Sequence, residues 1–324
     1  MEFPTVAGIE AASAELAPHL DATPLVHSEV LSRALGAEVW LKLEMVSPVA
    51  SYKLRGALVD LGRAGRRAPL AGAVVASSGN LGQGVAYAGR IFGLAADVFV
   101  HKAVNQLKLA MIEAFGGRVH KAGRDIDEAR EAAIEFAAER GLFFVNDGMS
   151  LDMMEGTATM GLEIARRLPD VDLVVVPMGG GNLAAGTAAA LKQLTPGARV
   201  VAVQAAAAPA IAESFHARRP IEKAGASVAD GLVSRIPVAF ALHALWEFLD
   251  DAWLVSEDDI LAALHTLIVS AHLLVEPSGG VALAAAWRRR DELRGKRVVL
   301  VLSGANASID EVRQALGVKP FTLS

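Results

Sequence analysis

The sequence predicts an α/β protein with open, parallel-rich sheets flanked by helices. Short apolar runs alternate with longer Ala-rich stretches along the chain, and this alternation is typical of parallel strands joined by helices. The short runs are apolar throughout, as expected for strands that helices cover on both faces. Three of them lead directly into turns rich in glycine, serine and asparagine. Open parallel sheets bind ligands at such strand ends.

Seven strands are expected in chain order, with helices between them. They are residues 38–43, 72–76, 96–100, 142–145, 173–177, 199–204 and 297–302. The stretch 125–139 is typical of the intervening helices, because Ile126, Ala129, Ala133 and Phe136 recur at helical spacing. A chain of 324 residues is long enough for two lobes, each with its own core.

The composition excludes several classes of protein. The formal net charge of −5 argues against a general nucleic-acid-binding protein, which would usually be basic. The absence of cysteine excludes disulfides, a thiolate nucleophile and a cysteine-ligated metal. The first residues lack a basic segment leading into an apolar core, and no apolar run is long enough to span a bilayer. We therefore expect a cytoplasmic protein with no nucleic-acid or membrane partner.

The first candidate functional residue is Lys53, in the segment Ser-Tyr-Lys-Leu-Arg-Gly-Ala at 51–57. A desolvated lysine loses its proton more easily than a solvated one, and only the neutral amine forms a Schiff base. The turn Ser-Ser-Gly-Asn-Leu-Gly at 77–82 follows the next predicted strand. Together they suit amine chemistry on a carbonyl cofactor. A lysine taken alone is more often a solvated surface residue, so the interpretation depends on the rest of the chain.

A glycine-rich loop follows the predicted strand 173–177 and opens a helix. Its residues are Gly179, Gly180, Gly181, Asn182 and Leu183. Glycine lets the backbone curl closely around an anion, and free N–H groups at a helix start favour phosphate. The glycine spacing also fits a loose dinucleotide-binding pattern, but that pattern needs an acidic residue at the end of the next strand. Gln204 stands there instead, so phosphate is the favoured ligand.

The third turn is Ser-Gly-Ala-Asn at 303–306, after the last predicted strand. Ser303 is either a helix cap or a neutral hydrogen-bond partner for a heterocyclic nitrogen.

Taken together, these segments resemble the fold type II pyridoxal-phosphate enzymes, specifically the serine/threonine dehydratase and serine racemase group. The segments that carry the resemblance are Thr23-Pro24-Leu25, Leu41-Lys42-Leu43-Glu44, the segments at 51–57 and 77–84, Gly156-Thr157, the loop at 179–183, Ala229-Asp230-Gly231, Glu276-Pro277-Ser278-Gly279 and Ser303-Gly304-Ala305-Asn306. They occur in the family's order and cover nearly the whole chain.

The resemblance implies the two-domain architecture of the tryptophan synthase β-like enzymes. We expect a large cofactor-binding domain made of residues 1–67 and 149–324, and a small inserted domain at 68–148. By the same resemblance Lys53 carries pyridoxal 5'-phosphate, the glycine loop holds its phosphate, Ser303 faces the pyridine nitrogen and Asn80 contacts the phenolic oxygen. The implied substrate-carboxylate site is formed by Ser77, Gly79, Asn80 and Leu81.

The resemblance also implies the reaction, in which a β-hydroxy-α-amino acid of the L-threonine or L-serine type yields a 2-oxo acid and ammonia. Lys53 is then the general base at Cα. A racemase is the alternative within this group, because a serine at the position of Ser78 serves there as the acid/base opposite the lysine. A lyase for a bulkier hydroxy amino acid and a ligand-binding member without activity are further alternatives.

Four departures from the family pattern bear on these expectations. Leu81 replaces the usual histidine, and we expect it either to admit a more apolar substrate or to slow the usual chemistry. Asn182 replaces a fourth glycine and Tyr52 a phenylalanine. After the strand 199–204, where some members bind a divalent cation through carboxylates, this chain has alanines. Because hard cations prefer anionic oxygen ligands, we expect no metal there. We also expect a homodimer, the commonest soluble assembly.

Overall fold

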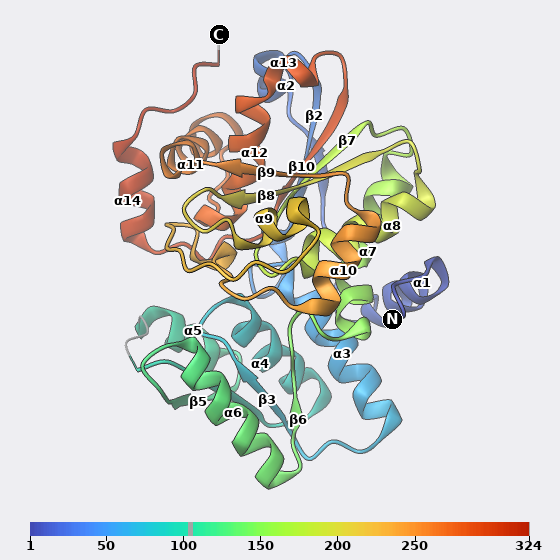
Figure 1. Ribbon diagram of the computed structural model, residues 1–324, viewed down its shortest axis with the longest axis vertical. Coiled ribbons are helices and arrows are strands. Elements are labelled where there is room, and N and C mark those ends of the chain that lie inside the picture. The colour runs from blue at the N-terminus through green and yellow to red at the C-terminus, as the bar shows by residue number, and fades with distance from the viewer. Residues whose placement is uncertain (103–105, 324) are drawn as a thin grey trace.

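Two separate β-sheets organise the chain in the computed structural model, which describes residues 1–102 and 106–323. The larger sheet has six strands and the smaller has four (Figure 1). The smaller sheet is built from a continuous part of the chain that is inserted between the strands of the larger one. The structure therefore confirms the expected α/β class with parallel-rich sheets.

The six-stranded sheet has the order β1-β2-β10-β7-β8-β9. Its strands are β1 (Leu25–His27), β2 (Glu38–Leu43), β7 (Leu173–Pro177), β8 (Arg199–Ala205), β9 (Asp251–Val255) and β10 (Arg297–Leu302). All neighbours are parallel except β1, which runs antiparallel to β2. Leu302 pairs with Leu43, so β2 and β10 end side by side.

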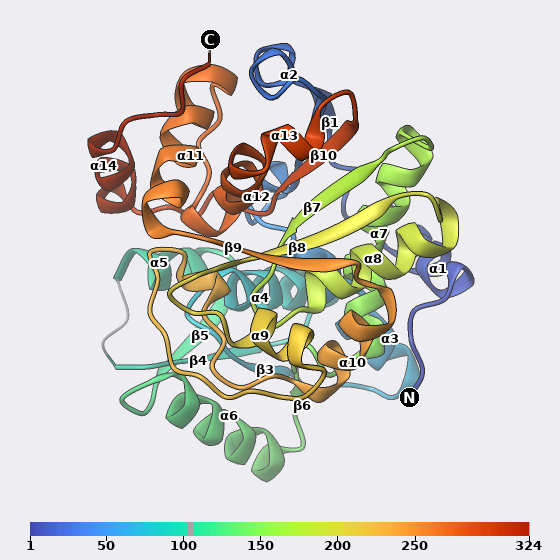
Figure 2. The same ribbon diagram turned by 45° about the horizontal axis from the view of Figure 1, so that its top comes forward.

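Helices cover both faces of this sheet, as Figure 2 shows. Alternate residues of β10 lie on opposite faces of the sheet. Leu300 belongs to one hydrophobic cluster, and Val299 and Val301 belong to the other. The face with Leu300 is covered chiefly by α2 (Glu29–Leu35), α11 (Glu257–Ala271), α12 (Pro277–Arg288), α13 (Arg290–Leu293) and α14 (Ile309–Gly317). The opposite face is covered by α7 (Leu151–Arg167), α8 (Asn182–Leu194), α9 (Ala210–Ala217) and α10 (Ala239–Phe248).

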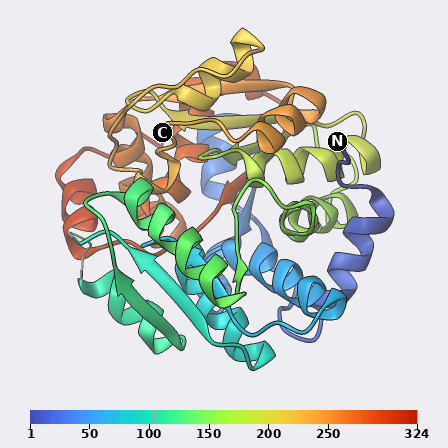
Figure 3. The ribbon, with the colours of Figure 1, turned by 60° about the horizontal axis from the view of Figure 1, so that its bottom comes forward.

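The small sheet has the order β5-β4-β3-β6 and is parallel throughout. Its strands are β3 (Ala73–Ala76), β4 (Ala96–Val100), β5 (Gly117–Lys121) and β6 (Phe143–Phe144). The helix α6 (Ile126–Arg140) packs on one of its faces (Figure 3). The other face is covered by α3 (Lys53–Arg67), α4 (Asn80–Phe92) and α5 (Gln106–Ala114).

The remaining elements are α1 (Val6–Leu16) and two short 3₁₀ helices, η1 (Glu44–Val46) and η2 (Asp230–Leu232). The hydrophobic cluster of the small sheet takes in Leu54 and Leu58 of α3 and Leu16 of α1. The domain boundaries predicted at 67/68 and 148/149 stay a prediction. In the described part of the chain, no helix has the length and apolar character that crossing a bilayer requires.

The predicted strands match best in the centres of the sheets. Four of them, β2, β4, β7 and β10, agree at both ends, and β3, β6 and β8 differ by one residue at one or both ends. The strands β1, β5 and β9 were not predicted, and each lies at an edge. An edge strand has a side open to water and carries more polar residues, as in Gly-Arg-Val-His-Lys of β5, so its apolar pattern is weak. The predicted helix 125–139 is α6, capped by Asp125.

Candidate active site

Lys53 is the first residue of α3, and the turn before it is tied to the turn after β10. Ser51 forms an isolated bridge with Gly304, and the N–H of Tyr52 donates to the carbonyl of Ser303 at 3.1 Å. The N–H of Ala305 donates to the carbonyl of Ala50 at 2.9 Å. Because β2 and β10 end side by side, these bonds hold the lysine next to the Ser303 turn.

The ammonium group of Lys53 forms an ion pair with Asp147. Asp147 lies between β6 and α7, where the chain leaves the small sheet. Burial acts to lower the pKa of Lys53, but the Asp147 carboxylate and the neighbouring Tyr52 outweigh it, so this pKa lies above the ordinary value. In this structure Lys53 is therefore a charged group held at one carboxylate.

The predicted glycine loop connects β7 to α8. A Cβ on Gly179 would lie 2.6 Å from the carbonyl oxygen of Gly231, so only glycine fits there. Gly181 has a φ of +101°, which L-residues with side chains rarely adopt. A Cβ on Gly180 would meet no described atom within 4 Å. The middle of the loop is thus open, beside the N–H groups that begin α8 and that helix geometry leaves without intrahelical partners.

Asn182 is the first residue of α8, and its side chain is buried. Its Nδ2 donates to Oδ1 of Asp147 at 3.1 Å. Its Oδ1 has no hydrogen-bond partner among the described residues. A buried unpaired polar atom is rare and costly, so this loop is incomplete without a ligand or water. The next residue, Leu183, packs in the hydrophobic cluster of the large sheet.

The second predicted turn follows β3 and begins α4. Ser77 Oγ accepts a hydrogen bond from the N–H of Gly79 at 3.3 Å, and Ser78 is half-buried. A Cβ on Gly79 would meet no described atom within 4 Å, so the turn faces open space at the start of a helix. Asn80 is the first residue of that helix.

Leu81 differs from what its place in the motif suggested. Its side chain is 7% exposed and joins the hydrophobic cluster of the small sheet with Val85 and Val98. The leucine that replaces the usual histidine therefore packs in this cluster. The expectation that the Leu81 side chain admits a more apolar substrate is not supported by this packing.

The side chain of Asn80 is held by the turn after β10 and by the residue before α12. Its Nδ2 donates to Oε1 of Glu276 at 2.7 Å, and its Oδ1 accepts from Asn306 at 2.8 Å. Glu276 in turn donates its backbone N–H to the carbonyl of Gly304 at 3.1 Å. The hydroxyl of Ser303, which is buried, belongs to the same turn.

The structure thus brings the predicted residues to one place, where β3, β6, β7 and β10 end. Lys53 and Asn182 meet at Asp147, and Asn80 meets the Ser303 turn through Glu276 and Asn306. The sequence reasoning missed Asp147, and it gave no role to Asn306 although it singled out the turn that contains this residue. The signal for Asp147 was present, since it follows the predicted strand 142–145 just as the other turns follow theirs.

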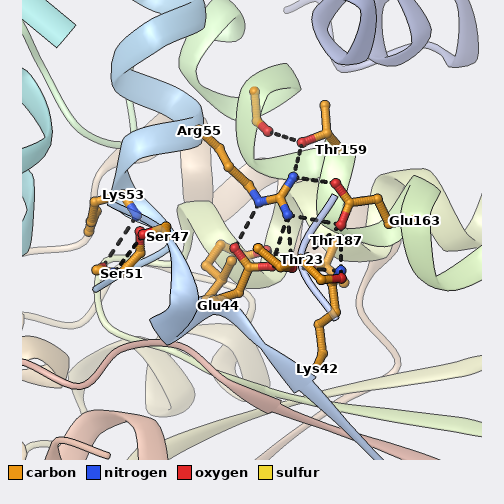
Figure 4. Close-up of polar contacts among 12 residues, drawn as sticks. Thr23, Lys42, Glu44, Ser47, Ser51, Lys53, Arg55, Thr159, Glu163 and Thr187 are labelled. Carbon is orange, nitrogen blue, oxygen red and sulfur yellow. Dashed lines mark hydrogen bonds and ion pairs between the residues drawn. The ribbon is translucent and has the colours of Figure 1, made fainter. Parts of the chain in front are cut away.

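A buried charge cluster lies beneath the first turn of α3. It consists of Thr23, Lys42, Glu44, Arg55, Thr159 and Glu163 (Figure 4). The guanidinium of Arg55 lies between the two carboxylates, with Nε 2.7 Å from Glu44 and Nη1 2.6 Å from Glu163. Burial acts to raise the pKa of Glu44, but the charge and hydrogen bonds of Arg55 prevail and lower it. The cluster therefore contains two cations and two anions, and it fixes α3 against β2 and α7.

The described residues give no indication of a metal site like the one that they give for the candidate active site. The described residues contain no group of three or more His, Asp or Glu side chains placed to hold a metal ion. Gln204, at the end of β8, accepts hydrogen bonds from the N–H groups of Ile211 and Ala212 at 3.2 and 3.0 Å. It therefore caps the start of α9.

A lysine, a glycine loop with an open middle and a turn at a helix start thus lie together at the ends of parallel strands, an arrangement that suits an enzyme with an anionic carbonyl cofactor. Residues 16–304 match the family described as pyridoxal-phosphate dependent enzyme. The chain belongs to this family, and its fold is that of the fold type II enzymes. The site fits the cofactor: it offers an amine and an open loop at the start of a helix, where backbone N–H groups can bind a phosphate.

The similar proteins include threonine-degrading enzymes. The chain is 34% identical over 306 residues to the L-threonine ammonia-lyase of Geobacter sulfurreducens, covering 94% of this chain and 76% of that one. It is 33% identical over 309 residues to the L-threonine ammonia-lyase of Thermotoga maritima, covering 95% and 77%. Threonine deaminase isoform 2 from Solanum lycopersicum superposes with a TM-score of 0.90 at 28% identity, covering 97% and 94% of the two chains.

Proposed function

We propose that the protein is a pyridoxal-phosphate-dependent ammonia-lyase that converts a β-hydroxy-α-amino acid of the L-threonine or L-serine type to a 2-oxo acid and ammonia. The observation that carries this proposal is the juxtaposition of Lys53 and the glycine loop at Asp147. A pure binding protein has no need of such a lysine. The activities named for the similar proteins support the choice of substrate class.

Four parts of the site would hold the cofactor. Lys53 would bind it through the amine, the N–H groups at 179–183 would bind the phosphate, and Ser303 would face the pyridine nitrogen. Asn80 would contact the phenolic oxygen, since one of its two Nδ2 hydrogens is taken by Glu276 and the other remains available. When bound, the cofactor supplies a sink for the electron pair left at Cα.

The substrate carboxylate would bind at the turn that begins α4. Ser77, Gly79, Asn80 and the backbone N–H of Leu81 surround the start of this helix, where free N–H groups and the helix dipole favour an anion. The open space at Gly79 leaves room for that group.

Lys53 would transfer the proton. Its Nζ, when neutral, would take the proton from Cα of the bound substrate, and the C–H electron pair would remain on the substrate. Ser78, next to the carboxylate turn, is the residue that would return a proton from the opposite face in a racemase. Loss of the β-hydroxyl as water, followed by addition of a water molecule and release of ammonia, would leave the 2-oxo acid.

The test is 2-oxo acid release from the purified protein with L-serine, L-threonine, 3-hydroxyaspartate and phenylserine, together with chiral analysis of the remaining substrate. We expect oxo acid from L-threonine or L-serine. Oxo acid from phenylserine alone would indicate a lyase for bulkier substrates, and inverted substrate without oxo acid would indicate a racemase acting through Ser78. A protein that binds these amino acids but turns over none would be a ligand-binding member.

Replacing Lys53 with Ala should lower turnover by more than about a thousandfold, because both the attachment of the cofactor and the base are lost. The matched control is Lys223→Ala, which removes a lysine from an ion pair with Glu213 at the surface. Turnover by Lys53→Ala comparable to that of the control would overturn the assignment.

We also propose that the active protein is a cytoplasmic homodimer. The prevalence of two-fold homodimers among soluble oligomers supports the assembly, and the acidic, cysteine-free composition is compatible with the cytoplasm. Light scattering of the purified protein and fractionation of the source cells would test the two statements.

A further inference from the structure

Asp147 uses both of its carboxylate oxygens within the site. Oδ2 pairs with Nζ of Lys53, and Oδ1 accepts the hydrogen bond from Nδ2 of Asn182. These two partners come from different helices, α3 and α8, while Asp147 lies on the connection from β6 to α7. One carboxylate therefore joins the lysine to the loop that would bind phosphate.

The orientation of the Asn182 amide follows from this contact. Turning the amide over would place its Oδ1 against the Asp147 carboxylate, so Nδ2 must face Asp147. Asn182 stands where glycine is usual in the family, and a glycine has no side chain to make this bond. The link between Asp147 and the loop is thus a feature of this chain's own residues.

We propose that Asp147 is a positioning residue that holds Lys53 beside the glycine loop as its counter-ion, with Asn182 fixing the carboxylate. This inference rests on the proposed function. In the molecule without cofactor, Asp147 keeps the lysine charged and in place. During turnover, the ammonium formed when Nζ takes the Cα proton again has its positive charge next to the Asp147 carboxylate.

Two opposite consequences follow from this role. Only a neutral amine can attack the cofactor's aldehyde, forming a C=N bond as the aldehyde oxygen leaves as water. A counter-ion therefore slows loading of the cofactor. The same negative charge stabilises the ammonium that forms in the proton transfer, so it favours turnover. Removing the charge should speed the first process and slow the second, whereas a merely structural residue would impair both.

The experiment compares Asp147→Asn and Asn182→Gly with the unmodified protein, all freed of cofactor. The matched control is Asp291→Asn, which removes one carboxylate from an exposed ion pair with Arg294. Asp291 belongs to α13, which lies at the end of the molecule opposite the small sheet (Figure 1). Trace labelling with acetic anhydride across a pH range, quantified on the Lys53 peptide by mass spectrometry, gives the titration midpoint of Lys53. The rate of rise in visible absorbance at saturating pyridoxal phosphate gives the loading rate.

In Asp147→Asn we expect the midpoint to fall by at least about one pH unit, and the loading rate near neutral pH to rise about tenfold for each unit. Asn182→Gly keeps the Asp147 carboxylate but removes its hydrogen bond from Asn182, so the Lys53 midpoint should fall by less. In Asp291→Asn the midpoint should not change. Turnover by Asp147→Asn should drop although the cofactor is loaded. If Asp147→Asn does not fold, Asn182→Gly carries the test.

An unchanged midpoint in both variants would overturn the proposal, even if the unmodified protein is an active lyase. Failure of the proposed function would look different. The unmodified protein would then show neither cofactor absorbance nor turnover, while the Lys53 midpoint, measured without cofactor, would still fall in Asp147→Asn.

Discussion

Replacing Arg55 with Met tests whether the buried charge cluster holds the fold together. Arg55 is 1% exposed, and its guanidinium donates hydrogen bonds through two nitrogens each to Glu44 and Glu163, and through one each to Thr23 and Thr159. Without it the cluster contains one cation and two anions, and the remaining cation beside Glu44 is the Lys42 ammonium at 3.9 Å. Leaving one partner of a buried ion pair uncompensated costs about 3–5 kcal/mol.

The assay is urea unfolding of the cofactor-free protein, followed by far-UV circular dichroism. We expect a loss of about 3–5 kcal/mol in the free energy of unfolding, which for a chain of this size lowers the melting temperature by roughly 6–10 °C. The control Arg313→Met removes an arginine from an exposed ion pair with Asp310 and should cost less than about 0.5 kcal/mol.

Charge imbalance predicts a partial rescue. Adding Glu44→Gln to Arg55→Met restores neutrality in the cluster, so the double variant should be more stable than Arg55→Met by about 1–2 kcal/mol. A loss below about 1 kcal/mol in Arg55→Met, or no gain from the second substitution, would show that the cluster is well solvated and that the reasoning from burial is wrong.

Two further predictions concern a buried acid and the glycine loop. Burial raises the pKa of Asp60 to about 6, despite a hydrogen bond from Ser150. The folded pKa lies above the unfolded value of 3.8, so the folded state favours the protonated side chain. The free energy of unfolding is therefore highest, as far as Asp60 is concerned, below about pH 4. It falls by up to about 3 kcal/mol as the pH rises through about 6. Asp60→Asn should remove this part of the pH dependence, which unfolding measurements between pH 4 and 7 would show; an identical profile in both proteins would contradict the assignment. Gly181→Ala should weaken pyridoxal phosphate binding and cost about 1–3 kcal/mol of stability, since φ is +101° and the new Cβ would lie 2.8 Å from Leu245. The control is Gly180→Ala, because the new Cβ would meet no described atom within 4 Å. Titration of the cofactor into both variants should show weaker binding only in Gly181→Ala. Equal losses of affinity in the two variants would mean that the loop backbone adjusts freely.

Local patterns explain why much of the fold was predictable. The central strands β2, β4, β7 and β10 are short apolar runs that need no knowledge of their neighbours to be recognised. The turns at Ser77, Gly179 and Ser303 were placed at the ends of such strands, and in parallel sheets these ends lie on one edge. Lys53 became a candidate functional residue only because these turns occur in the same chain.

A residue's environment comes from distant parts of the chain, which the sequence pattern does not show. Leu81 was predicted at the substrate-carboxylate site, which stays a prediction, and its side chain packs in the hydrophobic cluster of the small sheet. Asp147 was overlooked because its partner, Lys53, is 94 positions away in the sequence.

The sequence by itself determined the fold class, the central strands, the lysine and the glycine loop, because these depend on short-range periodicity and on residue chemistry. Only the tertiary structure decided which charges meet. Arg55 and Lys53 are two positions apart on one helix and have different surroundings. Arg55 binds Glu44 and Glu163 in the interior (Figure 4), and Lys53 binds Asp147 at the site. The physical reason is that electrostatic interactions depend on distance in space and on burial, and neither is encoded in sequence spacing.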